Sequence, residues 1–303
     1  MIKQPSIDVI IPSYNSKKTI VKCLDSVLNQ SYKRPYKVIV VDSSNDGTDK
    51  LIKTRYTSVK LIHFNEKVFP GKARNIGLKY TTADYVAFTD TDCIVDYYWL
   101  EQITESFRTA NYDAVGGSIL NGTQESIVGT LGYLNEFSFY MPGINSGPVT
   151  ATATANVTYR RNIFSEYQFI ENSFAGEDTV FHWVLVNNGS TLFFNSKIKV
   201  THINKKYFFH VVKHQKEIGK GAAIARVIMK KDMILAHFPL LCLIFLPWIR
   251  LLRMKSRLFI YENKLFWKTF LFFPISYIIA FSWSWGFYQT MIKHKKTTSI
   301  KTN

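Results

Sequence analysis

The chain has 303 residues, of which 47% are apolar and 15% aromatic, so intrinsic disorder is excluded as a description of the whole. Residues 197–303 hold 20 basic and 3 acidic side chains, whereas residues 1–196 hold 18 and 19. A nucleic-acid-binding protein carries basic residues around its recognition elements, and we therefore expect no nucleic-acid partner. The three cysteines are far apart in the sequence, which argues against a disulfide framework and a cysteine-rich zinc site.

Short β-branched runs alternate with helix-like segments over the first part of the chain. The expected strands are 7–12, 36–41, 59–64 and 85–89, and the expected helices between them are 16–30, 48–56 and 72–80. This alternation predicts an α/β fold with a mostly parallel sheet that helices cover on both faces. Ligands of such sheets bind at the carboxyl ends of the strands, so polar residues that follow a strand are the first candidates for a site.

The pattern is looser beyond residue 97. It indicates a helix over 99–109, a strand over 112–115, a helix over 176–188 and a short hairpin over 191–200. The segment before the third helix lacks the spacing of a phosphate-binding P-loop, and no GxGxxG motif follows the first strand. A kinase or a nicotinamide dehydrogenase is therefore unsupported.

The last third is basic and hydrophobic. Lysines interleave with aromatic and aliphatic residues over 204–232, which favours an amphipathic helix on an anionic membrane surface over a solvated basic face on a core helix. Hydrophobic segments follow over 233–249 and 270–288, with a basic link between them and a basic tail. Because the positive-inside rule places both link and tail in the cytoplasm, we favour a re-entrant or interfacial hairpin over two full spans.

The first residues of the chain contain an apolar run too short for a secretory signal. We therefore expect residues 1–232 to stay in the cytoplasm, on the cytoplasmic face of a membrane.

Polar residues follow two of the expected strands. Asp90, Thr91 and Asp92 come directly after the fourth strand, and two carboxylates one residue apart can bind one Mg²⁺ or Mn²⁺ while leaving positions open for a diphosphate. A capped or solvated turn is the alternative for this motif. Asp42 ends the second strand, where it could accept hydrogen bonds from a base or ribose, and Arg74 at the start of the third helix suits a phosphate.

Together, and in this order, these motifs resemble those of the family 2 glycosyltransferases, which have the GT-A fold. The matching segments are Val9–Asn15, Val41–Thr48, Ala73–Leu78, Asp84–Asp92, Ala155–Arg161, Gly176-Glu177-Asp178 and His202. The resemblance covers about 200 residues and leaves the hydrophobic tail outside it.

The resemblance implies a role for each matching residue. Contacts to a nucleotide sugar would come from Pro12, Tyr14, Asp42, Arg74, Asp90 and Thr91, with Tyr14 stacking on the base. The Mg²⁺ or Mn²⁺ ligands would be Asp90, Asp92 and His202, the general base would be Asp178, and the donor-sugar and acceptor pocket would include Asn156, Arg160, Arg161 and Glu177. A structural hydrogen bond is the alternative for His202, and a charge that stabilises a helix N-terminus is the alternative for Asp178.

The chain departs from the family pattern at two places. Ser43 stands where a second Asp often follows Asp42, and the Gln/Arg-x-x-Arg-Trp signature of processive synthases is absent after Asp178. We therefore expect transfer of one sugar per encounter. A single base without a partnering acid suits an inverting reaction, since hydrolases use two carboxyl groups that flank the bond.

These observations predict a GT-A catalytic domain over 1–203, a basic amphipathic interfacial segment over 204–232 and a hydrophobic membrane-associated region over 233–303. The predicted reaction is the metal-assisted transfer of one sugar, with a UDP-sugar as the expected donor, to a hydroxyl of a lipid-linked or other cell-envelope glycan acceptor. One alternative is a catalytically inactive membrane scaffold of the same family. Another is a sugar nucleotidyltransferase, which would need a glycine-rich, arginine-containing loop where this chain has Pro12-Ser13-Tyr14-Asn15.

Overall fold

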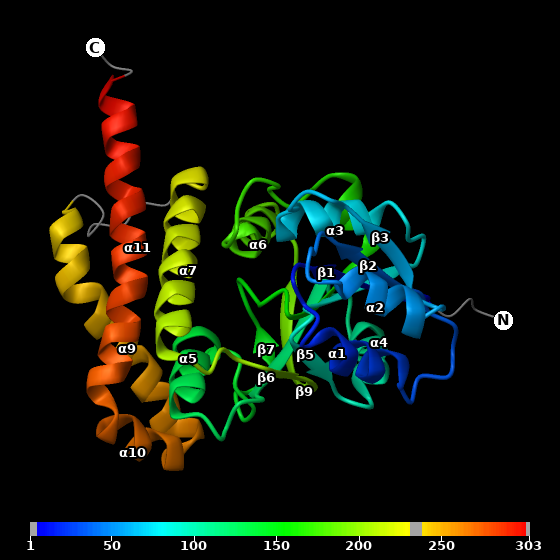
Figure 1. The fold of residues 1–303 in the computed structure, drawn as a ribbon, viewed down its shortest axis with the longest axis horizontal. Coiled ribbons are helices and arrows are strands. Elements are labelled where there is room, and N and C mark those ends of the chain that lie inside the picture. The colour runs from blue at the N-terminus through cyan, green and yellow to red at the C-terminus, as the bar shows by residue number, and fades with distance from the viewer. Residues whose placement is uncertain (1–4, 231–237, 301–303) are drawn as a thin grey trace. The chain divides into compact units, whose positions relative to one another are not determined.

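The structure is a computed structural model that describes residues 5–230 and 238–300. The chain forms two compact units (Figure 1). Unit 1 comprises Met1–Leu120, Asn145–Ser173 and Phe181–Ile203 and contains the β-sheet. Unit 2 comprises Asn121–Ile144, Phe174–Val180 and Asn204–Asn303 and is built mainly of helices.

One half of the sheet in unit 1 is parallel. The strands β1 (Ile7–Ser13), β2 (Val38–Asp42), β3 (Lys60–His63) and β4 (Tyr85–Thr89) lie in the order β3-β2-β1-β4, and every pairing among them is parallel. The β-branched residues that predicted these strands are buried in β1, β2 and β4, whereas β3, at the end of the strand order, is only partly buried. The predicted α/β fold is therefore confirmed in this half, and the carboxyl ends of these four strands meet at one edge.

The other half of the sheet contains antiparallel strands. β8 (Asn156–Arg160) pairs antiparallel with both β4 and β6 (Ala114–Asn121). The long strand β9 (Leu192–His202) pairs antiparallel with β5 (Cys93–Val95) and β7 (Gly147–Pro148). The hairpin expected over 191–200 is wrong, because this segment is one continuous strand that binds two short partners from distant parts of the chain.

Helices cover both faces of the sheet in unit 1. They are α1 (Ile20–Leu28), α2 (Thr48–Arg55), α3 (Pro70–Leu78) and α4 (Trp99–Thr109), with a 3₁₀ helix over Arg161–Ser165. α6 (Glu177–Asn187) begins in unit 2, and its residues from Phe181 onward belong to unit 1. Ala73 of α3 and Phe181 of α6 share one apolar core with Phe88 of β4, so these helices hold the strands from which the candidate residues emerge.

Unit 2 is a helical assembly. Its helices are α5 (Ile127–Phe137), α7 (Phe208–Ile228), α9 (Pro239–Tyr261), α10 (Asn263–Leu271) and α11 (Phe273–Ile300). α7 and α11 approach closely at two glycines: a Cβ on Gly219 would lie 1.9 Å from the carbonyl oxygen of Trp283, and one on Gly286 would lie 2.0 Å from that of Lys216. The segment predicted to lie on a membrane surface is thus largely a packed helix, and its placement on a membrane stays a prediction.

The hydrophobic segments have other boundaries than we expected. α9 continues through the predicted basic link to Tyr261, and α10 follows before α11, so three helices take the place of a simple hairpin. Residues 231–237, with the start of the first hydrophobic segment, and 301–303 lie outside the described residues. Within the described ranges no single helix is both long and apolar enough to span a bilayer. α10 and α11 would meet that criterion together, but they join at 91°.

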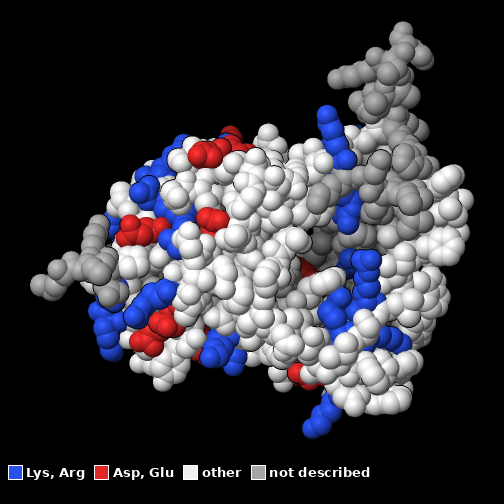
Figure 2. All heavy atoms as spheres, turned by 180° about the vertical axis from the view of Figure 1, so that it is seen from behind, with Lys and Arg blue, Asp and Glu red and all other residues white. Residues whose placement is uncertain are grey.

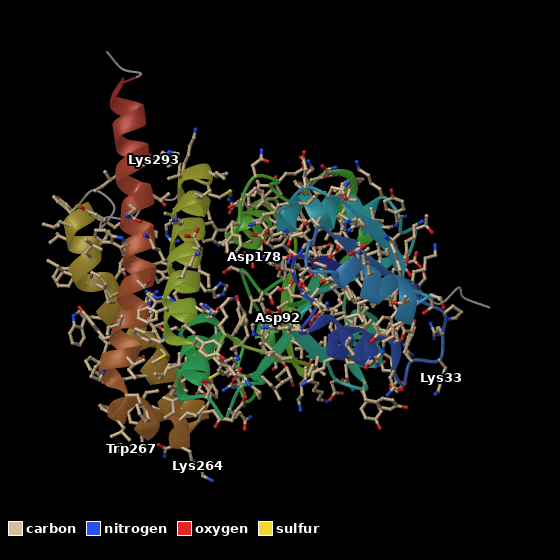
Figure 3. All side chains as sticks on the ribbon, viewed as in Figure 1. Lys33, Asp92, Asp178, Lys264, Trp267 and Lys293 are labelled. Atoms are coloured by element: carbon tan, nitrogen blue, oxygen red, sulfur yellow. The ribbon has the colours of Figure 1, made fainter. Side chains whose placement is uncertain are left out.

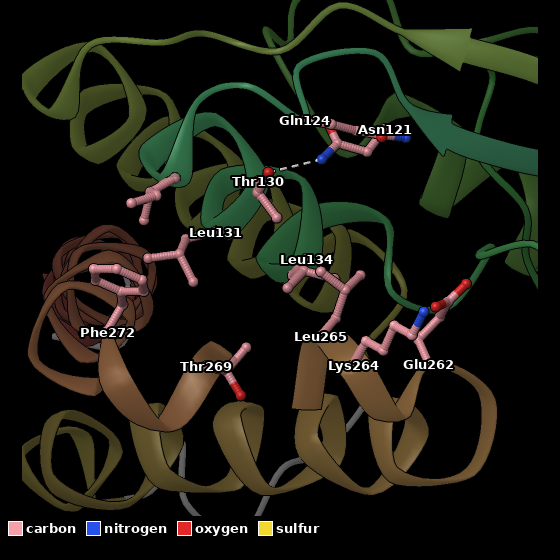
Figure 4. A pocket seen from close by; sticks show the side chains of 11 residues that line it. Asn121, Gln124, Thr130, Leu131, Leu134, Glu262, Lys264, Leu265, Thr269 and Phe272 are labelled. Carbon is pink, nitrogen blue, oxygen red and sulfur yellow. Dashed lines mark hydrogen bonds between the residues drawn. The ribbon is translucent and has the colours of Figure 1, made fainter. Parts of the chain in front are cut away.

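Charge is distributed differently over the two units. Figure 2 shows Lys and Arg gathered over unit 2 with few acidic side chains, whereas both signs are mixed over unit 1. Unit 2 also contains a cavity of about 400 Å³ beneath α10 (Figure 4). Leu131, Leu134 and Phe272 line its apolar part, while Asn121 donates a hydrogen bond of 2.9 Å to Thr130 at its polar end.

Candidate active site

The loops that follow β1, β2 and β4 are tied together at the carboxyl edge of the parallel strands. The Ser13 hydroxyl donates to Asp42 Oδ1 at 2.6 Å, and the hydroxyl oxygens of Ser16 and Thr91 lie 2.7 Å apart. The backbone N–H of Asn15 donates to Ser44 Oγ at 2.7 Å, with Asn15 in the left-handed region at φ +51°. These bonds keep residues 14–19 out of the first turn of α1, which therefore begins at Ile20 and leaves an ordered loop at the edge.

The loop after β1 presents an aromatic ring to solvent. Tyr14 is 43% exposed, and the ammonium of Lys67 lies 4.6 Å from the centre of its ring. The half-buried Pro12, opposite Val41 in the register of β1 and β2, precedes this loop. An exposed tyrosine face with a cation above it can stack on a planar base and attract a phosphate. Sequence reasoning did not identify Lys67, which follows β3 without any motif.

Asp42 is more enclosed than we predicted. Its carboxylate has no exposed surface and accepts hydrogen bonds from Ser13, from Ser44 and from the ring of His63, whose Nδ1 lies 2.7 Å from Asp42 Oδ2. The register of β2 and β3 sets Asp42 directly opposite His63. Asp42 therefore positions the groups around it, whereas the sequence pointed to direct contact with a base or ribose. Sequence reasoning did not identify His63, although a polar residue at the end of an apolar strand could have pointed to it.

Arg74 and the aspartates that follow β4 form the charged centre of this edge. Arg74 is buried, with its guanidinium 5.8 Å from the ring of Phe169, and its Nη2 donates to Asp90 Oδ1 at 3.0 Å. Burial raises the pKa of the Asp90 carboxyl, and Asp92 raises it further, while Arg74 lowers it. The local structure thus concentrates negative charge beside one buried cation, which is an environment that favours the binding of a further cation.

Asp92 and His202 lie together, as the sequence predicted. Cys93 of β5 pairs with His202 of β9, and this pairing brings the His202 Nε2 atom to 3.4 Å from Asp92 Oδ1. Ligand atoms of Asp92, Cys93 and His202 all lie within 4.8 Å of one another. Burial raises the pKa of the Cys93 thiol well above its ordinary value, and the nearby carboxylates of Asp92 and Asp90 raise it further. A carboxylate with an imidazole suits Mn²⁺ and other divalent ions, so these residues fit the predicted metal.

Three predicted pocket residues lie elsewhere or are fully engaged. The side chain of Asn156 is buried, donates to the carbonyls of Ser118 and Ile198, and accepts from the indole of Trp99, so it joins neighbouring elements of unit 1. Because β8 runs antiparallel to β4, Arg160 lies opposite Tyr85, at the amino end of β4 and away from Asp90.

Arg161 is directed to the same end as Arg160. The Arg161 Nε atom donates to the carbonyl of Ala83, and the Arg160 Nε atom donates to that of Tyr112. Because β8 runs opposite to the strand that carries the aspartates, both arginines lie at the far end of β4 from Asp90, which argues against the predicted place of either one near the diphosphate or acceptor.

Glu177 and Asp178 form the first turn of α6 and belong to unit 2. Asp178 is half-buried, and its Oδ1 accepts from the backbone N–H of Thr179 at 2.6 Å. Glu177 is buried. Gly176, at φ +85°, precedes them, and a Cβ there would lie 2.4 Å from the carbonyl of Gly221 on α7. Burial raises the pKa of the Tyr140 hydroxyl, and the nearby carboxylate of Asp178 raises it further. Figure 3 labels both Asp178 and Asp92.

The fold and this edge define the class of protein. A parallel half-sheet that carries an exposed ring, a buried arginine and paired aspartates at its carboxyl edge is a nucleotide-binding α/β arrangement. Residues 8–168 match the family model described as glycosyl transferase family 2. The chain belongs to this family, and the predicted family is confirmed.

Relatives of this chain carry glycosyltransferase names. Glycosyltransferase AglE of Haloferax volcanii is 36% identical over 120 residues, which span 38% of this chain and 40% of AglE. WfaP of Escherichia coli, named as a UDP-Glc:α-D-GlcNAc-diphosphoundecaprenol β-1,3-glucosyltransferase, is 30% identical over 154 residues, which span 50% of this chain and 56% of WfaP. The chain thus matches less than two thirds of the length of either relative.

Solved structures share the fold over nearly the whole chain. TarS 1–349 of S. aureus, in complex with UDP-GlcNAc, is 16% identical with a TM-score of 0.57, over 96% of this chain and 92% of that one. The mannosyltransferase PcManGT of Pyrobaculum calidifontis, in complex with GDP-Man and Mn²⁺, is 18% identical with a TM-score of 0.61, over 93% of this chain and 87% of that one. The predicted GT-A-like fold is therefore confirmed.

Proposed function

We propose that this protein is an inverting glycosyltransferase that moves one sugar from a nucleotide diphosphate sugar to a hydroxyl group of a glycan acceptor. The observation that carries the proposal is the cluster of Asp90, Asp92 and His202 beside the buried Arg74 at the carboxyl edge of the sheet. A UDP-sugar is the first donor to test and a GDP-sugar the second, in keeping with the donors bound in TarS and PcManGT.

In this proposal unit 1 holds the nucleotide. The exposed ring of Tyr14, which Pro12 precedes at the end of β1, stacks on the base. Asp42 positions Ser44 and His63 by hydrogen bonds, and these two residues contact the edge of the base or the ribose. Asp90 and Thr91 bind the ribose and diphosphate region, and Arg74 keeps the Asp90 carboxylate oriented by its hydrogen bond.

Asp92 and His202 would hold a Mg²⁺ or Mn²⁺ ion, with Asp90 as a further oxygen ligand. When bound, such an ion supplies Lewis-acid stabilisation of the charge that develops on the leaving diphosphate. The protein's own contribution is to orient the ligands: the Cys93–His202 strand pairing positions the imidazole, and the backbone of Asp92 accepts from the N–H of Ile203 at 2.7 Å.

We assign the general base to Asp178. The role requires an ionised carboxylate that can accept the proton of the attacking hydroxyl. Asp178 stands in the first turn of α6, where its Oδ1 accepts from the backbone N–H of Thr179 at 2.6 Å. A single carboxylate in this role gives one displacement and inversion at the sugar carbon, whereas two carboxylates that flank the bond belong to hydrolases. We keep Glu177 as a neighbour that shapes the acceptor pocket.

We further propose a lipid-linked acceptor, with the protein attached to the cytoplasmic face of a membrane. The printed name of WfaP, whose acceptor is a diphosphoundecaprenol-linked sugar, supports this choice of acceptor class. The basic and hydrophobic C-terminal third supports the attachment.

Calorimetry with UDP, GDP and CDP, each with and without Mn²⁺ or Mg²⁺, tests the proposal on the full chain in detergent. We expect one nucleotide to bind only with the metal, and Asp92→Asn to abolish this binding. Glu105→Gln on α4, which removes an equal charge from an exposed side chain 3.3 Å from Arg108, is the matched control. If no nucleotide binds under any metal, the assignment of the edge fails and an inactive scaffold becomes the leading function.

A further inference from the structure

α9 exposes a stripe of large apolar side chains in addition to the apolar side that it buries, which includes Leu246, Leu251 and Leu258. Phe245, Trp248, Leu252 and Phe259 recur at intervals of three, four and seven residues, and each is exposed by 45% or more. They therefore line one side of the helix. A helix that packs a soluble core buries such a stripe and exposes its charges, so the exposed stripe of α9 lacks the partner that its composition calls for among the described residues.

Two arginines of α9 point toward the protein and are partly buried. Arg250 Nη2 donates to the carbonyl of Asn135 at 2.8 Å, and its guanidinium lies 4.1 Å from the ring centre of Trp283. Arg257 Nη2 donates to Ser138 Oγ at 2.9 Å, and its guanidinium lies 3.6 Å from the ring of Phe139. Burial lowers the pKa of both groups. Two cations of α9 thus contact the protein while a row of its large apolar side chains is left exposed.

α11 also exposes rings. Phe281 and Trp285, four residues apart, are exposed by 38% and 37%. Its buried side mixes serines with apolar residues such as Ile279 and Phe287, and the Ser282 hydroxyl donates to the carbonyl of Val212 on α7 at 2.7 Å. Large exposed apolar side chains on two neighbouring helices are expected where the surroundings are less polar than water.

Ring contacts join the outer sides of the three helices into one surface. Phe259 of α9 lies 5.4 Å from Phe266 of α10, which lies 5.1 Å from Phe270. The Lys255 ammonium lies 3.4 Å from the centre of the Phe270 ring and 5.2 Å from that of Phe273, at the start of α11. We call this surface the aromatic face and define it by Trp248, Leu252, Phe259, Trp267, Phe270 and Leu271, all exposed by 45% or more.

The charges around the aromatic face indicate what covers it. Residues 239–294 hold seven Lys and Arg and a single acid, Glu262. Lys264 is exposed beside Trp267, and Figure 3 shows both at the same end of unit 2. Tryptophan together with lysine is the combination that lies at the headgroup level of bilayers, where the ring is buried and the ammonium meets anionic lipid. Since α10 and α11 join at 91°, this surface is suited to lie along a leaflet.

We propose that the aromatic face inserts into the headgroup and upper acyl layer of an anionic bilayer, so that α9, α10 and α11 lie in one leaflet without crossing it. Only the purpose of the insertion rests on the proposed function: insertion would bring the enzyme to an acceptor that is held in the bilayer. The insertion itself depends on the residues named above.

Co-sedimentation of the full chain, diluted from detergent, with vesicles tests the proposal. We expect binding to vesicles of equimolar phosphatidylglycerol and phosphatidylcholine, and weaker binding to phosphatidylcholine alone. The triple variant Leu252→Gln, Trp267→Gln, Leu271→Gln should lower the partition coefficient about 10²-fold or more, because three apolar side chains no longer enter the acyl layer. The matched control is Tyr80→Gln, Tyr97→Gln, Tyr98→Gln, which alters exposed rings of unit 1 and should leave binding unchanged. Equal binding by the two triple variants would overturn the proposal.

Tryptophan fluorescence separates insertion from electrostatic adsorption. Phospholipids brominated in the acyl chain should quench the emission of bound protein, since Trp248 and Trp267 would lie within the layer, and high salt should leave this quenching in place. Binding that salt reverses without quenching would contradict insertion. Insertion would also be contradicted if the chain failed to bind vesicles but formed dimers in sedimentation equilibrium, while the Leu252, Trp267 and Leu271 variant stayed monomeric. The aromatic face would then be an interface between copies of the chain.

Nucleotide binding of the same samples keeps the two proposals distinct. The Leu252, Trp267 and Leu271 variant should bind the nucleotide like the parent, which shows that it is folded. Vesicle binding without nucleotide binding would refute the proposed function alone, and nucleotide binding without vesicle binding would refute the insertion alone.

Discussion

The two units of this chain place polar and apolar residues in different ways. Unit 1 buries Asp42 and Arg74 close to its carboxyl edge, and the large apolar side chains that it exposes among the described residues are tyrosines. Unit 2 buries several serines among apolar residues and exposes a continuous set of aromatic and aliphatic side chains on α9, α10 and α11. The two units thus differ in how much large apolar surface they expose among the described residues.

Charged side chains in the interior have different roles in the two units. In unit 1 the buried Arg74 is paired with the partly exposed Asp90 at the carboxyl edge of the sheet. In unit 2 the partly buried Arg250 donates to a backbone carbonyl and lies over the face of Trp283. The first arrangement indicates chemistry, and the second indicates a helix held against its neighbours.

Substitution of Asp178 gives the largest expected effect and tests whether unit 2 takes part in the chemistry. Asp178→Asn should lower kcat by about 10²- to 10⁴-fold, because the acceptor hydroxyl loses its general base. Nucleotide affinity should not change, since the nucleotide is assigned to unit 1. Steady-state kinetics and calorimetry check the two parts, with Glu217→Gln on α7 as a control that removes an acid paired with Lys220. Unchanged kcat in Asp178→Asn would show that another residue is the base.

Gly219→Ala probes the packing of unit 2. The new Cβ would lie 1.9 Å from the carbonyl oxygen of Trp283, so α7 and α11 must separate. We expect a loss of about 1–3 kcal/mol in the free energy of unfolding. Gly147→Ala in unit 1, where nothing lies within 4 Å of the new Cβ, should stay within about 0.5 kcal/mol of the parent. Denaturant titration in detergent compares the two, and equal stability of both variants would contradict the close helix approach.

His63→Gln tests whether His63 holds Asp42 and the loop after β2 in place. Asp42 Oδ2 would lose the imidazole that lies 2.7 Å away, and the loop after β2 would lose part of its support. The loss of one hydrogen bond to a charged group, about 1.5 kcal/mol, corresponds to about a tenfold weaker nucleotide affinity by calorimetry. His210→Gln, an exposed histidine of α7, should leave the affinity unchanged. The same affinity in both variants would mean that Asp42 holds its position without His63.

Arg160→Gln has the smallest expected effect. Because Arg160 lies at the amino end of β4, over the rings of Tyr85 and Phe107, nucleotide affinity and kcat should remain within about twofold of the parent, as at a site away from the chemistry. A decrease comparable to that of His63→Gln would restore the role that the sequence motif suggested for this arginine.

Much of unit 1 could be predicted from the sequence because its signals are local. Continuous β-branched runs predicted β1 to β4, and the positions of Asp90, Asp92 and Tyr14 after strand ends placed them at one edge. His202 could be placed near Asp92 only through the family motif, and the structure supports this through the pairing of β5 with β9. The outward side of α9 was missed because its arginines suggested a polar link between two segments, whereas Arg250 and Arg257 belong to one long helix and point toward the protein.

The sequence by itself determined the family, the parallel half of the sheet and the presence of an acidic motif at a strand end, since each depends on residues close together in the chain. Only the tertiary structure decided which residues meet. The antiparallel direction of β8 moved Arg160 away from the aspartates, and the register of β2 and β3 joined His63 to Asp42. Strand direction and register are set by pairing between distant segments, so the sequence of a single segment does not specify them.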